Sequence, residues 1–404
     1  MCGIVGYVGN KSVVDILLDG LEQLEYRGYD SSGIAVMCEE DIKVYKAVGK
    51  LQNLRDKLKG HETEFNNSTM GIGHIRWATH GAPTLLNAHP HTCNCGNLVV
   101  VHNGIIENYK ELRKSLEEAG CIFRSQTDTE TIAHLVARKY AQCKDLTEAV
   151  RLASEEIEGA YALCVMHNDC KNKLVITKRN APLLIGIGDS EYFAASDVPA
   201  IIKHTNKAVY LEDNQIATLT PESMDIIDVE KNKISPKIEI LPWEPVALSK
   251  MGYKHFMLKE IHEQPDVIRN ILVGRLHAPD EEIILNEVNL NKERLRHLNR
   301  IQIIACGTSL HAAMVGKYLI ESFCGIAVDV EASSEYIYRK TVTDEHTLVI
   351  GVSQSGETAD TLTAIRQAKA KGSHILIITN RPDSAMAREA DSLIPVNAGI
   401  EVSV

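Results

Sequence analysis

The sequence predicts two domains of different fold class, an α+β domain followed by an α/β domain. Its 404 residues are enough for two or three domains at roughly 100–200 residues each. Before about residue 240, short apolar strands cluster with helices grouped between them, which favours antiparallel sheets covered by helices. After residue 300, a strand, a glycine-containing turn and a helix follow one another twice. That order is typical of a parallel sheet.

Each element of the first domain is predicted from its apolar period. Short apolar runs bounded by turn residues predict strands at Gly3–Val8, Gly33–Met37, Met70–Arg76, Leu98–Asn103, Ala160–His167, Lys173–Thr177, Tyr192–Ala195 and Gln215–Thr220. Apolar residues at helical spacing predict helices at Val13–Glu25, Asn108–Ala119, Asp128–Tyr140 and Leu146–Ile157.

The pattern changes near Pro236. Residues 241–279 begin with several prolines and show no clear period, so we expect a linker between a first domain at 2–240 and a second at 280–404. The predicted helices after Leu241 are Pro265–Val273, Asp280–Asn286, Leu310–Phe323 and Ala359–Lys371, and the predicted strands are Ile301–Ala305, Thr347–Val352 and His374–Thr379. The sequence stops directly after another strand-like segment, so we expect an α/β domain that is incomplete at its C-terminus.

Composition excludes several classes of partner. Hydrophobic residues make up 44% and charged residues 24%, an ordinary globular balance. The formal net charge of -11 and the lack of a basic tract argue against binding to nucleic acid or to a membrane surface. No apolar run approaches ~18 residues, and the N-terminus lacks the layout of a signal peptide. The ten cysteines are scattered, which is typical of free thiols in a reducing cytoplasm.

Cys2 directly follows the initiator methionine. Removal of Met1 would leave a thiol and a free α-amine on one residue. An amine with a pKa of about 7.7–8.0 can act as the base that activates such a thiol. Cys2 is therefore a candidate nucleophile for amide hydrolysis, although a cysteine can also occupy position 2 by chance.

Motifs rich in polar residues follow Cys2 at intervals. Their sequences are YRGYDSSG at 26–33, GHIRWATHG at 73–81, AHPH at 88–91, VHNGIIEN at 101–108 and SQTDTE at 125–130. Simpler interpretations exist for single residues. Arg76 could be a surface ion-pair partner, Asp128 could cap a helix, and Asn103-Gly104 is a common hairpin-turn dipeptide.

Taken together and in this order, the motifs resemble the glutaminase domain of class II glutamine amidotransferases, which are N-terminal-nucleophile hydrolases. The resemblance covers about the first 240 residues and implies an α/β/β/α sandwich with Cys2 as nucleophile. It implies an oxyanion hole from Asn103 and Gly104. It also implies the glutamine-binding residues Arg76, Trp77, Thr79, His80 and Asp128, with Arg27 and Trp77 gating the passage of ammonia. No cofactor is expected.

His89, His91, Cys93 and Cys95 form a dense H-x-H-x-C-x-C cluster. Its spacing is tighter than that of paired zinc ligands. The family resemblance explains the two histidines as parts of a loop beside the active site, but it does not explain the two cysteines. We expect no metal site here.

Two serine- and threonine-rich turns follow predicted strands of the second domain, CGTS at 306–309 and SQSGET at 353–358. Hydroxyls and free N–H groups at a helix N-terminus suit a phosphate dianion, although such residues are also ordinary helix caps. From about Asp280 the chain resembles a sugar isomerase (SIS) domain. The resemblance implies phosphosugar contacts from Thr308, Ser309, Ser353, Gln354, Ser355, Thr358 and Val404.

The order of the two domains resembles the amidotransferases that transfer ammonia from glutamine to fructose 6-phosphate and isomerise the product to glucosamine 6-phosphate, the first step of hexosamine synthesis. That family carries a second SIS domain, which we do not find, so we expect at most glutaminase activity from this chain, as a homodimer. Asparagine synthetase and phosphoribosyl amidotransferase are alternatives, but their acceptor-site motifs are not found. The remaining alternative is a phosphosugar sensor without catalytic activity.

Overall fold

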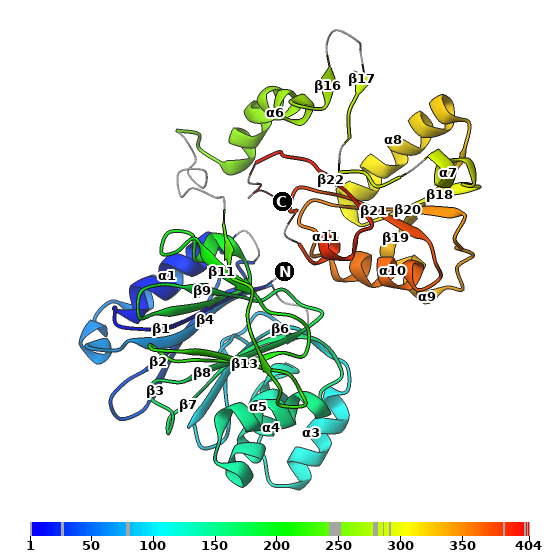
Figure 1. The fold of residues 1–404 in the computed structure, drawn as a ribbon. Coiled ribbons are helices and arrows are strands. Elements are labelled where there is room, and N and C mark those ends of the chain that lie inside the picture. Colours follow the sequence, from blue (N-terminus) through cyan, green and yellow to red (C-terminus); the bar gives the residue numbers. More distant parts are fainter. Residues whose placement is uncertain are drawn as a thin grey trace. The chain divides into compact units, whose positions relative to one another are not determined.

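The computed structural model describes residues 2–25, 28–77, 81–241, 252–277, 282–285, 287–290, 292–382, 384–399, 401 and 403. The chain divides into two compact units, Met1–Ser249 and Lys250–Val404, which are described one at a time (Figure 1). None of the helices described is both long and apolar enough to cross a membrane.

The first unit contains two large antiparallel sheets. The first sheet has the order β15-β11-β9-β10-β1-β4-β2-β3 and the second β14-β13-β12-β8-β7-β6-β5. The strands of the first sheet are β1 (Gly3–Val8), β2 (Ser31–Met37), β3 (Ile42–Val48), β4 (Met70–Arg76), β9 (Leu184–Ile187), β10 (Tyr192–Ala195), β11 (Lys207–Tyr210) and β15 (Glu239–Ile240). Those of the second are β5 (His91–Thr92), β6 (Leu98–Ile106), β7 (Gly159–His167), β8 (Leu174–Arg179), β12 (Ile216–Leu219), β13 (Met224–Ile227) and β14 (Lys233–Ile234).

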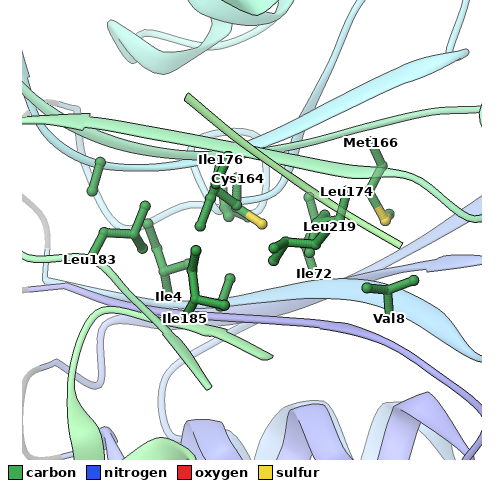
Figure 2. Close-up of a cluster of buried hydrophobic side chains, with 14 of the residues drawn as sticks. Ile4, Val8, Ile72, Cys164, Met166, Leu174, Ile176, Leu183, Ile185 and Leu219 are labelled. Carbon is green, nitrogen blue, oxygen red and sulfur yellow. The ribbon is translucent and has the colours of Figure 1, made fainter. Parts of the chain in front are cut away.

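The two sheets face each other across an apolar core. Figure 2 shows side chains of the first sheet, such as Ile4 and Ile72, meeting Cys164 and Ile176 of the second. Helices cover the outer faces: α1 (Val13–Gln23) and α2 (Leu51–Leu58) lie on the first sheet, and α3 (Tyr109–Glu118), α4 (Thr129–Cys143) and α5 (Leu146–Glu156) on the second. The unit is therefore the predicted α/β/β/α sandwich.

Strand β6 shows why the sequence of a central strand is an unbroken run of apolar residues. Val99 and Val101 belong to the core between the sheets. Leu98 and Val100 belong to a second core, beneath α3, α4 and α5. Because both faces of β6 are covered, successive residues are all apolar until His102, where the strand approaches the polar site.

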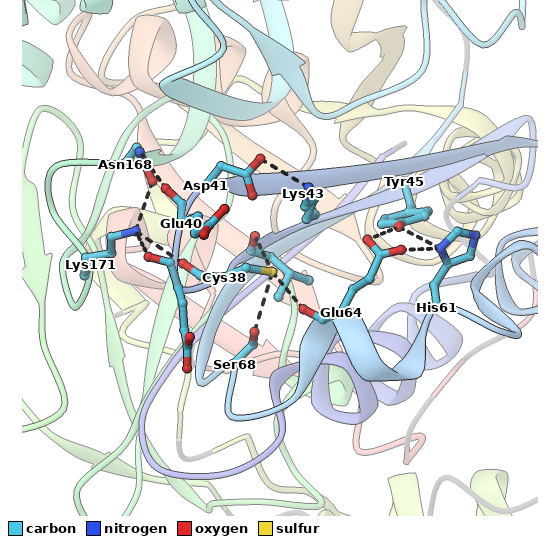
Figure 3. Close-up of polar contacts among 12 residues, drawn as sticks. Cys38, Glu40, Asp41, Lys43, Tyr45, His61, Glu64, Ser68, Asn168 and Lys171 are labelled. Carbon is cyan, nitrogen blue, oxygen red and sulfur yellow. Dashed lines mark hydrogen bonds and ion pairs between the residues drawn. The ribbon is translucent and has the colours of Figure 1, made fainter.

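Hydrogen bonds connect the two sheets between the turn after β7 and the turn after β2. Lys171, in the turn after β7, donates hydrogen bonds to the carbonyl oxygens of Cys38 (3.3 Å) and Glu39 (2.7 Å), in the turn after β2. Asn168 donates to the Glu40 carbonyl (3.3 Å) from the same side (Figure 3). These contacts hold the β2–β3 hairpin against the second sheet.

The second unit is built on a parallel sheet with the order β19-β18-β20-β21-β22. Its strands are β18 (Arg300–Ala305), β19 (Ala327–Ala332), β20 (Thr347–Ser353), β21 (His374–Thr379) and β22 (Ser392–Pro395). Its helices are α6 (Phe256–Leu272), α7 (Lys292–Arg296), α8 (Gly307–Cys324), α9 (Ser333–Tyr338), α10 (Ala359–Lys369) and α11 (Ala385–Glu389). A short hairpin pairs β16 (Leu276–His277) with β17 (Glu282–Ile283).

Most predicted elements are confirmed within a few residues, and two expectations after Leu241 are wrong. A helix was predicted from Pro265, but α6 begins at Phe256 and contains Pro265 in its interior. A helix was predicted over Asp280–Asn286, but Glu282 and Ile283 form a strand because they pair with Leu276 and His277. Residues 280, 281 and 286 lie outside the described part.

Candidate active site

Strand pairing positions Cys2. Because β1 runs antiparallel to β4, with Gly3 opposite Ile75, Cys2 lies beside the end of β4. The Cys2 Sγ is 3.3 Å from the backbone nitrogen of Trp77, which donates to it, and 3.4 Å from the Trp77 carbonyl oxygen. The thiol is therefore held at the point where the RWATHG motif begins.

Asn103 and Gly104 lie inside strand β6, where they pair with Ala162 and Tyr161 of β7. They are not a hairpin turn, so that simpler interpretation is wrong. The Asn103 side-chain Nδ2 donates to the Cys2 carbonyl oxygen at 3.2 Å. Gly104 has a φ of 126°, and a Cβ there would lie 2.0 Å from the Ala160 carbonyl oxygen, so only glycine fits.

His74 fixes the orientation of the Asn103 amide. The His74 Nε2 is 3.0 Å from both the His102 carbonyl oxygen and the Asn103 Oδ1. A carbonyl oxygen only accepts, so Nε2 carries the proton and the Asn103 atom facing it is the oxygen. The Asn103 amino group is left to face the Cys2 carbonyl. Burial lowers the pKa of His74 to about 3, so the ring is neutral at physiological pH.

His89, His91 and His102 extend this buried cluster toward the start of α4. The His74 and His89 rings stack with centroids 4.0 Å apart. His91 Nε2 lies 3.1 Å from Thr127 Oγ1, and His102 Nδ1 lies 2.9 Å from Thr129 Oγ1. Burial lowers the pKa of all three rings. Within the described residues no three potential ligands are grouped for a metal ion.

Arg76 is a buried residue at the end of β4, with 3% of its surface exposed. Its guanidinium donates to the carbonyl oxygens of Gly81 (3.1 Å) and Ala82 (3.4 Å). Burial lowers the pKa of Arg76, and the charges of Cys2, Asp30 and Asp128 oppose that shift. A buried cation beside a thiol is not a surface ion-pair partner, so that simpler interpretation is also wrong.

Asp128 stands at the N-cap position of α4, yet its side chain caps nothing. Its Oδ2 instead accepts a hydrogen bond from the backbone nitrogen of Ile106 (2.9 Å), at the end of β6. Asp128 is a buried residue, with 5% of its surface exposed. Because Asp128 and Asn103 are both anchored to β6, the strand holds a carboxylate and an amide at the same polar end of the sandwich.

The remaining predicted glutaminase residues are only partly described. Trp77 is 45% exposed, and its ring meets that of Tyr29 edge-on at 5.6 Å. Arg27, Thr79 and His80 lie outside the described residues. The buried His74 was missed as a separate site residue, although its place two residues before Arg76, on one face of a strand, was a usable signal.

A second candidate site lies in the Lys250–Val404 unit. Strand order reverses between β18 and β20, and ligands of open α/β sheets bind beyond the carboxyl ends of strands at such a point. A pocket of about 540 Å³ lies there. Its lining includes Ser309, Ser353 and Gln354, three of the residues expected to contact a phosphosugar, together with Glu260 of α6 and Asn380.

The 353–358 turn is held by its own hydroxyl groups. Ser353 Oγ accepts from the Gly356 nitrogen (3.1 Å) and lies 3.1 Å from Thr358 Oγ1. Ser355 Oγ accepts from the Glu357 nitrogen (3.2 Å). Thr358 occupies the N-cap position of α10, but its side chain makes no capping hydrogen bond. The turn is thus organised locally and leaves the start of α10 uncapped by Thr358.

Not every predicted phosphosugar residue lines the pocket. Thr308, Ser355 and Thr358 are not among the lining residues, and Val404 lies outside the described part. Glu260, Glu263 and Glu401 do line it, and among the described lining residues there is no lysine or arginine. Any anion bound here would therefore depend on uncharged donors, namely hydroxyl groups, side-chain amides and backbone N–H groups.

Comparison with known proteins agrees with this architecture. A model of the glutamine amidotransferase domain matches residues 32–244, and a model of the SIS domain matches residues 294–404. The first match covers more than half of the 404 residues. The chain belongs to the glutamine amidotransferase family.

Among curated relatives, the chain is 48% identical over 404 residues to the glutamine–fructose-6-phosphate aminotransferase (isomerizing) of Caldanaerobacter subterraneus subsp. tengcongensis, covering 100% of this chain and 66% of the relative. It is 47% identical over 404 residues, with the same coverage, to the protein of that name from Symbiobacterium thermophilum. The chain thus spans just under two thirds of the length of these relatives.

Among solved structures, the chain resembles a glutamine phosphoribosylpyrophosphate amidotransferase from B. subtilis, with a TM-score of 0.50 and 18% identity, covering 98% of this chain and 91% of that one. At this identity the likeness concerns the fold.

Proposed function

We propose that this chain hydrolyses glutamine with the Cys2 thiol. The observation that carries the proposal is the grouping around Cys2. The Trp77 nitrogen donates to the thiol, the Asn103 amide faces the Cys2 carbonyl, and β6 places the Gly104 backbone next to that amide. The buried cation of Arg76 and the buried carboxylate of Asp128 lie close enough to interact.

The proposed chemistry uses these groups in turn. After removal of Met1, the Cys2 α-amine takes the thiol proton and the sulfur attacks the side-chain amide carbon of glutamine. Asn103 Nδ2 and the Gly104 N–H stabilise the oxyanion, and the Cys2 α-ammonium group returns its proton to the amide nitrogen, which leaves as ammonia. Water then hydrolyses the resulting thioester to glutamate and the free thiol. Arg76 holds the α-carboxylate of glutamine and Asp128 its α-ammonium group, opposite charges that suit the two ends of a free amino acid.

The proposed acceptor of the ammonia is fructose 6-phosphate, with glucosamine 6-phosphate as the product. Support comes from the names of the relatives at 47–48% identity and from the pocket at the switch point, lined by Ser309, Ser353 and Gln354. Because the chain spans 66% of those relatives, the transfer and the isomerisation belong to the proposal.

The test is glutamate release from glutamine by the purified chain, in parallel with Cys2→Ala and Asn103→Ala. We expect Cys2→Ala to abolish release and Asn103→Ala to lower kcat by about 10²–10³-fold, the usual cost of one oxyanion donor. Added fructose 6-phosphate tests the acceptor through the formation of glucosamine 6-phosphate. Binding of the sugar phosphate without any glutamine turnover would favour the sensor over the enzyme.

We also propose a homodimer and a cytoplasmic location. Helix α8 exposes several large apolar side chains that favour burial against another surface, Met314, Val315, Tyr318, Leu319 and Phe323. All ten cysteines are free thiols, as expected in a reducing compartment. Light scattering coupled to size exclusion should give the mass of a dimer, and a monomeric mass at micromolar concentration would contradict that part of the proposal.

A further inference from the structure

Two thiols at the tip of the β5–β6 hairpin are in direct contact, and the proposed glutaminase chemistry uses neither. The Cys93 Sγ and Cys95 Sγ are 3.0 Å apart. Other cysteines contact oxygen atoms instead. The Cys143 sulfur lies 3.3 Å from the Asp145 carbonyl oxygen, and the Cys306 sulfur lies 3.7 Å from Thr361 Oγ1.

A tight turn brings the two sulfurs together. The Gly96 nitrogen donates to the Cys93 carbonyl at 3.0 Å, and Gly96 follows with a φ of 74°. Alternate residues of an extended strand share a face but lie about 6.6–6.8 Å apart along the chain, at the far limit for a disulfide. The turn shortens that separation. Asn94 anchors it, because its Oδ1 accepts from the Ile122 nitrogen at 3.3 Å.

The two thiols differ in accessibility. Cys95 is exposed, whereas Cys93 is 5% exposed and packs in the core beneath α3 and α4. Burial, together with the hydrogen bond to Cys95, raises the pKa of Cys93. An oxidant from solution therefore reaches Cys95 first, while Cys93 remains a protonated thiol in contact with it.

We propose that Cys93 and Cys95 form a redox-active dithiol that small-molecule disulfides, such as oxidised glutathione, convert to an intramolecular disulfide. The Cys95 thiolate attacks one sulfur of the small disulfide, forming a mixed disulfide and releasing one thiolate, which takes up a proton. Cys93 then gives up its proton and attacks the Cys95 sulfur, displacing the second thiol. The protein dithiol loses two electrons and two protons, and the small disulfide is reduced to two thiols.

The test uses the full chain carrying Cys2→Ala, so that the candidate nucleophile does not react. The protein is equilibrated in buffers of graded oxidised and reduced glutathione, remaining thiols are alkylated, and peptides are weighed by mass spectrometry. We expect the peptide with Cys93 and Cys95 to lose two hydrogens and to resist alkylation. The exposed Cys324 is the matched control, and it should stop at the mixed disulfide with glutathione.

Two variants separate the roles of the sulfurs. Cys93→Ser should trap the mixed disulfide on Cys95, and Cys95→Ser should leave Cys93 reduced under the same buffers. Cys95 is exposed, so its substitution reports on the chemistry even if Cys93→Ser fails to fold. A stable mixed disulfide on Cys95 of the otherwise native hairpin would overturn the proposal. So would a fully alkylated pair in a buffer that has already modified Cys324.

Discussion

At the scale of single residues, the amide of Asn103 is oriented by groups from two other segments of the chain. The Cys2 carbonyl, just before β1, accepts from its nitrogen, and His74 on β4 donates to its oxygen. A free asparagine side chain rotates easily, and its amide would then present oxygen or nitrogen to a substrate with similar ease. The buried, neutral imidazole of His74 removes that freedom and makes His74 a positioning residue.

Substitution of His74 by alanine should therefore impair turnover more than glutamine binding. We expect kcat to fall by roughly 10-fold or more, short of the full loss of an oxyanion donor, with KM nearly unchanged. His167→Ala is the matched control. His167 is also buried, but it lies at the end of β7 that pairs with Leu98, away from the part of β7 that pairs with Asn103. Equal losses in the two variants would mean that His74 acts only through stability.

The sequence identifies the types of these residues better than their contacts. The motifs around Arg76, Asn103 and Asp128 were sufficient to name them as candidates. The hydrogen bond from Ile106 to Asp128, which shows that Asp128 is no helix cap, depends on how β6 meets α4. Such long-range partners follow from sheet register, which short motifs do not specify.

At the scale of elements, the start of α4 is held by a buried carboxylate. The Oε1 and Oε2 atoms of Glu130 accept from the backbone nitrogens of Arg124 (2.8 Å) and Ser125 (2.6 Å). Burial alone would raise the pKa of Glu130, but interactions with His134, Ser125 and these N–H groups outweigh it and lower the pKa to about 2. These hydrogen bonds attach the loop that contains Thr127 and Asp128 to the first turn of α4.

This carboxylate makes the stability of the first unit depend on pH. The folded-state pKa of Glu130 lies below its unfolded value of about 4.3, so its contribution is present above that pH and is lost as the pH falls toward 2. We expect Glu130→Gln to lower the free energy of unfolding by on the order of 3 kcal/mol at pH 7 and by much less near pH 2.

Urea unfolding followed by tryptophan fluorescence measures this effect in the Met1–Ser249 unit, because Trp77 directly follows strand β4 of that unit. Glu111→Gln, an exposed change on α3, is the control. A loss for Glu130→Gln that does not change with pH would contradict the assigned role of the carboxylate.

Runs of apolar residues predict the long central elements of this fold, but they do not predict the short elements at its edges. Strands β1, β4 and β10 have the predicted bounds because their residues are almost all buried and mostly apolar. Strand β3 was missed because Lys43 and Lys46 interrupt its apolar residues and most of the strand is only partly buried. Helix α6 was misjudged at its start, since Pro265 suggests a first turn but lies in the interior, where several helix residues are exposed.

At the scale of the whole molecule, each compact unit contains its own candidate site. The glutaminase residues lie in Met1–Ser249, and the pocket lined by Ser353 lies in Lys250–Val404. The parallel sheet and its serine-rich turns were predicted from sequence. The acidic lining from Glu260 and Glu263 was not, because those residues come from α6, a helix outside the recognised turn motifs.

The two sites should be separable by substitution. Ser353→Ala removes a hydroxyl that accepts from the Gly356 nitrogen and lines the pocket. We expect affinity for fructose 6-phosphate to fall by roughly 5–10-fold, the cost of about one hydrogen bond, with glutamate release in the absence of sugar unchanged. Calorimetric titration measures the affinity, and Thr363→Ala, an exposed change on α10, is the control. An unchanged affinity would place the sugar phosphate elsewhere.

The central claim is that the thiol of Cys2 is the nucleophile. The most direct measurement is intact and peptide mass spectrometry of the chain after treatment with an electrophilic glutamine analogue, with and without competing glutamine. The account predicts loss of Met1, a single adduct on Cys2, protection by glutamine, and no adduct in Cys2→Ala. A processed N-terminus that stays unmodified, or a glutamine-protected adduct on another cysteine, would contradict it.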